Sequence, residues 1–339
     1  MTNPIDTLLA EKGVLLADGA TGTNLFAMGL ESGEAPELWN ETAPEKIEAL
    51  HRGFVEAGAD IILTNSFGGT RHRLKLHHAQ DRVFDLNRRA AALARGIADA
   101  AGREVIVAGS VGPTGELLQP LGAMTYDEAV DAFAEQMEGL KAGGADVAWI
   151  ETMSSPDEIR AAAEAAIRVG LPYTVTASFD TAGRTMMGLA PKDIHGVAEA
   201  FAEQPVGIGA NCGVGASDIL SSLFDMADAR PDATLIVKGN CGIPEFRGTE
   251  IHYSGTPELM ADYVRLAVDG GAKIIGGCCG TSFAHLAAMR VALDGHHRGP
   301  RPTVEDVVAR IGPLRNKIAS ESGAGTAGEA RRERRRARG

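Results

Sequence analysis

Eight short apolar runs dominate this sequence, and each is followed by glycine or polar residues and then by a longer segment. Most of the runs are continuously apolar, which is typical of strands buried on both faces of a parallel sheet. Eight strand–helix units predict an α/β fold, a (β/α)8 TIM barrel in a single domain. An open doubly wound sheet is the alternative, and no G-x-G-x-x-G follows the first run to support its dinucleotide-binding form. The runs are 14–22, 59–69, 104–115, 145–153, 172–180, 206–214, 233–242 and 272–281.

The segments between the runs carry apolar residues at helical spacing. In 44–59 the apolar positions recur every three or four residues, as on one buried helix face. The segment 127–145 repeats this pattern with Thr125 as an N-cap, and 155–170 begins with Ser-Pro and ends with Gly. Two longer connections, 20–43 and 66–84, are expected to cover an active site. Further helices are predicted at 190–204, 216–229, 256–272 and 281–295, with a closing helix within 296–319.

The composition supports one large core and a separate tail. The chain has 339 residues, of which 44% are hydrophobic, so residues 1–319 can form the barrel. Residues 320–339 are predicted to be a disordered Arg-rich tail, because they begin small and polar and end with six arginines and one glutamate in RRERRRARG. A net charge of −12 argues against nucleic-acid binding by the main body. The tail is interpreted as solvated, with RNA, an anionic surface or an acidic protein as alternative contacts.

Other features of the sequence favour a cytoplasmic protein. The N-terminus MTNPIDTLLAEKG lacks the basic start and apolar centre of a signal peptide, and no apolar run reaches the roughly 20 residues that span a membrane. Four cysteines at irregular spacing do not form a disulfide framework. In a reducing compartment, clustered cysteines more often bind metal or act in catalysis.

Residues capable of chemistry fall at the predicted carboxyl ends of the strands, where a barrel of this type carries its active site. Strands six and eight lie two positions apart around the ring, so their ends can share one ion. The polar and sulfur-bearing residues at these ends are Asp18, Asn65, Ser110, Glu151, Ser178, Asp180, Asn211, Cys212, Cys241, Cys278 and Cys279.

Three of the cysteines predict a zinc site with an open position. Cys212, Cys278 and Cys279 would supply three thiolates, and three protein ligands plus a vacancy are typical of catalytic zinc. Each cysteine alone could instead be a small buried hydrophobe. Cys241 is interpreted as inert, with a spare ligand or redox-sensitive neighbour as the alternatives. A zinc ion in three thiolates suits the binding of a further thiol, whose pKa it lowers and which then attacks a methyl donor.

Three motifs resemble the homocysteine-binding zinc methyltransferases, which include betaine–homocysteine methyltransferase, S-methylmethionine–homocysteine methyltransferase and the first module of cobalamin-dependent methionine synthase. The motifs are D-G-A-T-G-T (18–23), G-A-N-C-G (209–213) and G-G-C-C-G-T (276–281). The resemblance implies methionine formation in a homocysteine S-methyltransferase, with Zn²⁺ on Cys212, Cys278 and Cys279 as the catalytic centre. It also implies that Glu151 holds the homocysteine ammonium group and that the turn at Asp18 and Gly19 begins the homocysteine pocket.

The remaining substrate contacts and the methyl donor are less constrained. Asn65, Ser110 and Asn211 complete the predicted substrate-contacting set, although Asn65 and Asn211 could equally brace loops. The donor is either a methylated corrinoid protein supplied in trans or a small molecule such as glycine betaine or S-methylmethionine. Few aromatic residues are available to enclose a betaine cation, the nearby ones being Phe26, Trp39 and Phe67. The oligomeric state is open, and a homo-oligomer is compatible with the sequence.

Two other functions are carried as alternatives. Lys238, in I-V-K-G-N near the end of the seventh run, could be the Schiff-base amine of a barrel lyase or aldolase. That hypothesis leaves the cysteines unexplained. The other alternative is a non-catalytic subunit that binds zinc or docks a corrinoid protein, and it predicts zinc without turnover.

Overall fold

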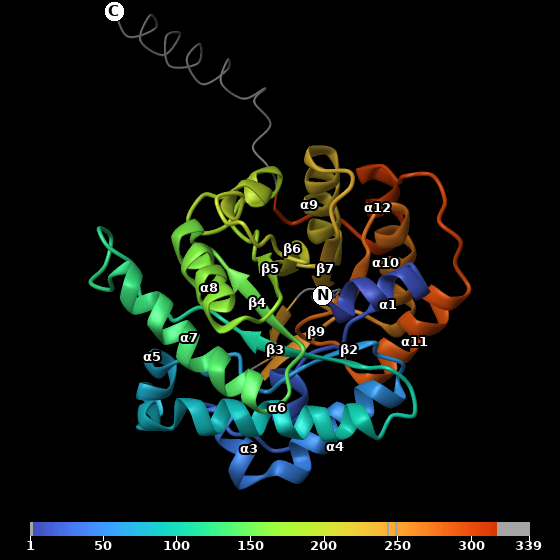
Figure 1. Ribbon diagram of the computed structural model, residues 1–339. Helices are drawn as coiled ribbons and strands as arrows, with labels where there is room; N and C mark the ends of the chain where they lie inside the picture. Colours follow the sequence, from blue (N-terminus) through green and yellow to red (C-terminus); the bar gives the residue numbers. More distant parts are fainter. Residues whose placement is uncertain (1–2, 243, 248–249, 317–339) are drawn as a thin grey trace, which may run out of the picture.

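Eight parallel strands form a barrel in the computed structural model, which describes residues 3–242, 244–247 and 250–316 (Figure 1). Their order around the barrel is β1, β10, β7, β6, β5, β4, β3, β2. The ring closes where Ala17 bridges to Ile61 and the Asp18 amide donates to the Ile61 carbonyl at 3.0 Å. This closure confirms the predicted barrel and excludes the open sheet. The strands are β1 (Leu15–Leu16), β2 (Ile61–Leu63), β3 (Ile106–Val111), β4 (Val147–Met153), β5 (Tyr173–Ala177), β6 (Gly207–Cys212), β7 (Leu235–Gly239) and β10 (Ile274–Gly277).

Helices surround the strands (Figure 1), and several begin where the sequence predicts. Thr125 and Ser155 cap their helices, because their hydroxyls accept hydrogen bonds from backbone amides of the first turn. No helix within the described residues is both long and apolar enough to cross a bilayer. The helices are α1 (Pro4–Lys12), α2 (Gly22–Ala27), α3 (Trp39–Thr42), α4 (Pro44–Glu56), α5 (Arg71–Leu74), α6 (Val83–Asp99), α7 (Tyr126–Ala142), α8 (Pro156–Val169), α9 (Ala216–Ala229), α10 (Pro257–Asp269), α11 (Phe283–Asp294) and α12 (Val304–Ile311), with 3-10 turns η1 (Pro36–Leu38), η2 (Lys75–His77), η3 (Gln80–Arg82) and η4 (Pro191–Val197).

Alternate residues of the strands fill the inside of the barrel. Because successive side chains point to opposite faces of a strand, Val147 and Trp149 of β4 share one face with Glu151. Val147 and Trp149 belong to the inner apolar cluster, which Ile5 and Leu8 of α1 close at the amino-terminal end of the strands. The interior is therefore apolar near α1 and becomes polar toward the carboxyl ends of the strands.

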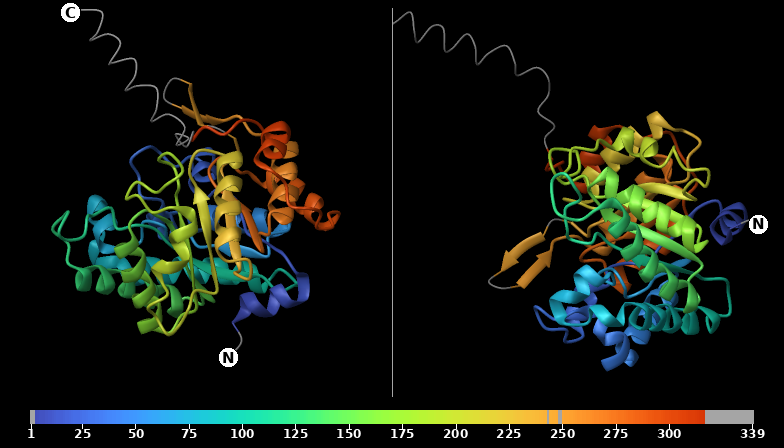
Figure 2. Two further views of the ribbon diagram at one scale, coloured as in Figure 1. Left: turned by 90° about the horizontal axis from the view of Figure 1, so that it is seen from above. Right: turned by 60° about the vertical axis from the view of Figure 1, so that its left-hand side comes forward.

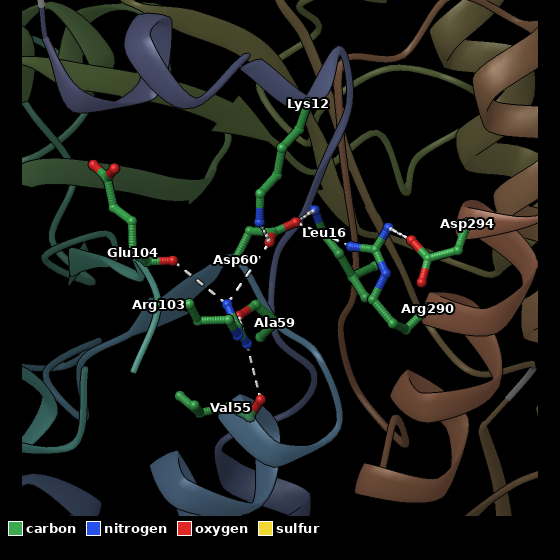
Figure 3. Close-up of polar contacts among 9 residues, drawn as sticks. All are labelled: Lys12, Leu16, Val55, Ala59, Asp60, Arg103, Glu104, Arg290 and Asp294. Carbon is green, nitrogen blue, oxygen red and sulfur yellow. Dashed lines mark hydrogen bonds and ion pairs between the residues drawn. The ribbon is translucent and has the colours of Figure 1, made fainter. Parts of the chain in front are cut away.

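A buried carboxylate ties several elements together at the amino-terminal end, called the base below. Asp60 is 2% exposed and accepts hydrogen bonds from the Lys12 ammonium at 2.6 Å and the Leu16 amide at 2.9 Å. The guanidinium groups of Arg290 and Arg103 approach the same carboxylate at 3.1 and 3.8 Å (Figure 3). Asp60 thus links α1, β1, α11 and the loop before β3.

Two predicted helices differ from the observed structure. The segment 190–204 forms only the 3-10 turn η4, because Gly196 weakens the helix and no side chain caps its start at Ala190. Within 296–319 the closing helix α12 is short, since prolines at 300 and 302 precede it and Gly312-Pro313 follows it. The predicted tail, 320–339, lies outside the described residues.

An antiparallel hairpin, which the run pattern did not predict, leaves the barrel between β7 and α10. Its strands are β8 (Pro244–Arg247) and β9 (Glu250–Tyr253). In both views of Figure 2 the hairpin and α1 lie at opposite ends of the molecule. Since α1 closes the base, the hairpin lies at the other end of the barrel, which is called the mouth below.

Candidate functional site

A cavity of about 520 Å³ opens at the mouth of the barrel. The expected covering segments contribute to its wall, since residues of 19–37 and 63–77 line it. Of the predicted site residues, the following line this cavity: Gly19, Asn65, Ser110, Glu151, Cys212, Cys278 and Cys279. Asp18 and Asn211 are not in the lining, and neither are Ser178 and Asp180 of the fifth unit.

Three thiols converge at one side of the cavity. Cys212 ends β6 and Cys278 and Cys279 follow β10, and their sulfur atoms all lie within 4.8 Å of one another. Sulfurs that share one tetrahedral zinc at a Zn–S distance of about 2.3 Å stand about 3.8 Å apart. Hydrogen bonds among the thiols raise the pKa of Cys212 and lower that of Cys279. The cluster therefore fits a soft, thiophilic cation with little rearrangement.

The backbone around the thiols is held in special conformations. Cys212 has a φ of 61°, which is unusual for a residue with a side chain, and Gly213 follows with a φ of 71°. The Asn240 side chain joins the two thiol-bearing segments, because its amide donates to the Gly213 carbonyl at 2.8 Å and its oxygen accepts from the Cys279 amide at 3.1 Å. Asn240 was not among the residues predicted for the site, although its position at the end of the seventh apolar run is a signal for it.

Cys241 does not join the cluster. Its side chain is fully buried, and burial raises the pKa of its thiol to about 12. Its amide donates to the Cys279 carbonyl at 2.9 Å, so it contributes through the backbone. These contacts favour the inert interpretation.

Tyr253, at the end of the hairpin, is a second residue that sequence reasoning missed. It lines the cavity, and its hydroxyl lies close enough to the Cys279 thiol to help lower the pKa of that thiol. A Cβ on Gly280 would lie 2.3 Å from the Tyr253 ring, so only glycine leaves room for the tyrosine beside the thiols. Because the hairpin itself was not predicted, no signal in the sequence pointed to this contact.

Glu151 lies on a distorted part of β4. The register of β4 against β5 shifts between Ile150 and Met153, and Thr152 has a φ of 60°. Asn211 holds this bulge, because its side-chain oxygen accepts from the Thr152 amide and its amide donates to the Thr152 hydroxyl, both at 2.7 Å. Asn211 therefore braces this part of β4, and its predicted contact with substrate stays a prediction.

The Glu151 carboxylate faces the cavity from a nearly dry environment. It is 8% exposed and accepts a hydrogen bond from the Ser110 hydroxyl at 2.5 Å. Burial raises its pKa to about 7, against the opposing attraction of Lys238. A buried carboxylate of this kind gains strongly from an ammonium partner.

Asp18 lies beneath the cavity and is paired with Lys238. The Lys238 ammonium donates to Asp18 Oδ1 at 2.7 Å, and the Leu63 amide donates to Oδ2 at 2.7 Å. Burial lowers the pKa of Lys238, but Asp18 and Glu151 outweigh it and raise this pKa overall. A Schiff-base amine needs the opposite shift, so this ion pair disfavours the lyase alternative.

Gly19 and Asn65 occupy positions fixed by packing. A Cβ on Gly19 would lie 2.7 Å from the Phe54 ring and 2.7 Å from the Thr281 carbonyl, so the turn requires glycine. The Asn65 amide donates to the Pro36 carbonyl at 2.7 Å and to the Asn40 side chain at 3.0 Å. Asn65 thus braces the covering segment even though it lines the cavity.

The sequence matches the family described as homocysteine S-methyltransferase over residues 15–293. It is 32% identical to the methionine synthase of Mycobacterium tuberculosis in an alignment of 321 positions that covers 88% of this chain and 26% of that protein. It is 31% identical to the methionine synthase of Mycobacterium leprae in an alignment of 325 positions that covers 90% of this chain and 26% of that protein. The chain therefore spans about a quarter of the length of these curated relatives.

Solved structures of the homocysteine methyltransferase MmuM from Escherichia coli are similar to this one. The oxidized form has a TM-score of 0.72 and 25% identity, and the match covers 86% of this chain and 99% of that chain. The metallated form has a TM-score of 0.71 and 26% identity, with 85% and 99% covered. The match over residues 15–293 takes in the cavity and all three thiols. The chain therefore belongs to the homocysteine S-methyltransferase family.

Proposed function

We propose that this protein is a zinc-dependent methyltransferase that methylates the thiol of homocysteine and forms methionine. The observation that carries the proposal is the convergence of Cys212, Cys278 and Cys279 in the same cavity as a buried carboxylate, Glu151. Zinc held by the three thiols would bind the substrate sulfur as a thiolate and so supply the nucleophile. Because the thiols must stay reduced, we also propose a cytoplasmic location.

The residues of the cavity orient the amino-acid end of the substrate in this proposal. Glu151 accepts hydrogen bonds from the ammonium group, and the Ser110 hydroxyl fixes the direction of that carboxylate. In the described part of the chain, the amides of Gly19 and Thr21 donate no backbone hydrogen bond, so they can bind the substrate carboxylate. Asp18 supports this turn from below through its bond to the Leu63 amide.

The methyl donor in this proposal comes from one of two classes. A small cationic donor, such as glycine betaine or S-methylmethionine, is supported by the presence of Phe26, Phe67, Glu34 and Glu37 in the lining of the cavity. The alternative donor is a methylated corrinoid protein supplied in trans. The similarity of this chain to about a quarter of two much longer methionine synthases supports this class. Incubation of the zinc-loaded protein with homocysteine and each donor in turn, with methionine as the product scored, separates the two classes.

Cys279→Ala tests the metal site directly. We expect loss of stoichiometric zinc, measured by atomic absorption, and loss of methionine formation with every donor. The barrel should stay folded by circular dichroism, because Cys279 lies at the mouth and outside the apolar interior. Cys241→Ala is the matched control and should keep its zinc. Stoichiometric zinc in Cys279→Ala would refute the three-thiol site, and zinc without turnover in the wild type would favour the non-catalytic subunit.

A further inference from the structure

Lys238 reaches Asp18 by crossing a neighbouring strand. Lys238 lies on β7 and Asp18 follows β1, and β10 runs between these two strands. Gly276 of β10 is in register with Lys238, and a Cβ on Gly276 would lie 3.0 Å from Lys238 Cγ and 3.0 Å from the Ala17 Cβ. Because Gly276 has no side chain, the Lys238 side chain can pass over β10 to reach Asp18. The ion pair therefore depends on glycine at position 276.

The pair lies at the inner end of the cavity, whose lining includes Lys238 but not Asp18. The side chains of Lys238 and Asp18 are 3% and 2% exposed, and 2.7 Å separates the Lys238 ammonium from Asp18 Oδ1. The ammonium also lies 5.9 Å from the centroid of the Trp149 ring, on the strand that carries Glu151. Lys238 attracts both carboxylates across the interior. We call Asp18, Glu151 and Lys238 the charged floor.

With both carboxyl groups ionised, the charged floor holds two carboxylates and one ammonium and has one negative charge in excess. Burial raises the pKa of Glu151 to about 7, so an incoming ammonium stabilises the ionised form of this carboxyl. Both oxygens of Asp18 are engaged, by Lys238 and by the Leu63 amide. Glu151 lines the cavity and accepts a hydrogen bond from the Ser110 hydroxyl. Buried charges require partners. Within the charged floor, Glu151 is therefore the carboxylate that an incoming cation meets.

We propose that Lys238 is a positioning residue that pairs with Asp18 and so leaves Glu151 as the one place on the floor where the substrate ammonium can bind. This inference rests on the proposed function. If the ammonium, the thiol and the carboxylate of homocysteine each have one place, the cavity distinguishes the two mirror forms of the amino acid. If Asp18 were unpaired, two carboxylates would compete for the ammonium and this distinction would weaken.

Binding of L- and D-homocysteine to the zinc-loaded full chain, measured by titration calorimetry, tests the role of Lys238. In the wild type the L form should bind tighter by about tenfold or more. The L form makes the charge-assisted hydrogen bond between its ammonium group and Glu151, and the D form loses it. In Lys238→Met the two forms should bind within about threefold of each other, because the ammonium gains a second carboxylate partner. A purely structural role would weaken both forms together and leave their ratio unchanged.

Two further variants complete the test. In Asp18→Asn the unpaired Lys238 is free to pair with Glu151, so L-homocysteine should bind about tenfold or more weaker. In the double variant Asp18→Asn/Lys238→Met, Glu151 is again unopposed, and the preference for the L form should return to within about threefold of the wild type. The double variant keeps the test open if Lys238→Met does not fold. Lys192→Met, at an exposed lysine, is the control and should match the wild type.

The outcomes separate the inference from the proposed function. A wild type that binds zinc but neither form of homocysteine would overturn the proposed function, whatever the variants do. A wild type that prefers the L form, with the same preference in Lys238→Met, would overturn the role of Lys238 alone. Loss of the preference for the L form in the double variant would also overturn the role of Lys238. In that variant Glu151 has neither a competing carboxylate at position 18 nor a competing ammonium at position 238.

Discussion

The two ends of the barrel each bury an aspartate, and the two aspartates are paired in different ways. Asp60 at the base is approached by three cations, Lys12, Arg103 and Arg290, whose side chains are 22–34% exposed. Asp18 at the mouth has one cationic partner among the described residues, Lys238, which is 3% exposed. At the base, the aspartate has several partly exposed partners, whereas at the mouth the aspartate has, among the described residues, one partner that is almost fully buried.

The two kinds of pairing suit different roles, stability at the base and substrate binding at the mouth. At the base, water and the remaining cations can solvate Asp60 when one partner is lost (Figure 3). At the mouth, loss of Lys238 leaves a carboxylate in a dry interior beside Glu151. A site that binds a charged substrate needs a buried group, here Glu151, whose charge the protein does not fully neutralise. The mouth is therefore less tolerant of substitution than the base.

The largest effect is expected from Lys238→Met. Removing one partner of a buried ion pair leaves the other charge unpaired, so we expect the free energy of unfolding to fall by about 3–5 kcal/mol. Urea denaturation, followed by circular dichroism, measures this change.

Asp18→Asn/Lys238→Met serves as the control for that loss. It removes both charges, while the introduced asparagine side chain can still accept a hydrogen bond from the Leu63 amide, so most of the lost stability should return. A double variant as unstable as Lys238→Met would mean that the lysine acts through packing rather than through its charge.

The sequence predicted the barrel because its signals are local. Each apolar run and each amphipathic helix can be recognised without knowledge of its partners, as Thr125 and Ser155 illustrate at their helix starts. The three thiols were also predictable, because the order of strands in a barrel places the ends of β6 and β10 on either side of β7.

The polar contacts across the barrel were not predictable, because they depend on distant pairs. The sequence offered Lys238 as an amine nucleophile, and only its contact with Asp18, 220 positions away, indicates a counter-ion. The roles of Asn240 and Tyr253 likewise depend on which backbone and thiol they meet. Side chains that join strands through the interior leave no periodic pattern in the sequence.

His51 extends the comparison to a buried titratable group that lacks a hydrogen-bond partner within the described ranges. It is fully buried in α4, neither ring nitrogen has a hydrogen-bond partner among the described residues, and burial lowers its pKa from 6.5 to about 4. The unfolded chain therefore binds a proton more readily, and stability should fall as the pH drops from about 6.5 toward 4. At pH 5.5 the loss relative to pH 7 should be about 1.2 kcal/mol.

Urea unfolding of the wild type and His51→Leu at pH 7 and pH 5.5 isolates this contribution. Leucine cannot take up a proton, so the drop between the two pH values should be smaller in the variant by about the amount expected for His51. An equal drop in both proteins would place the acid sensitivity elsewhere, at other groups that titrate in this range.

The smallest effect is expected from Lys12→Met, the counterpart at the base of Lys238→Met. Lys12 is 32% exposed, and Asp60 keeps the Leu16 amide at 2.9 Å and Arg290 at 3.1 Å when the lysine is removed. A partly exposed pair with other partners contributes little, so the free energy of unfolding should fall by less than about 1 kcal/mol. The same urea assay measures it, and zinc content should not change because α1 lies at the far end from the thiols. A loss as large as that of Lys238→Met would mean that Asp60 depends on one cation after all, and the two ends of the barrel would then differ in position rather than in how their charges are paired.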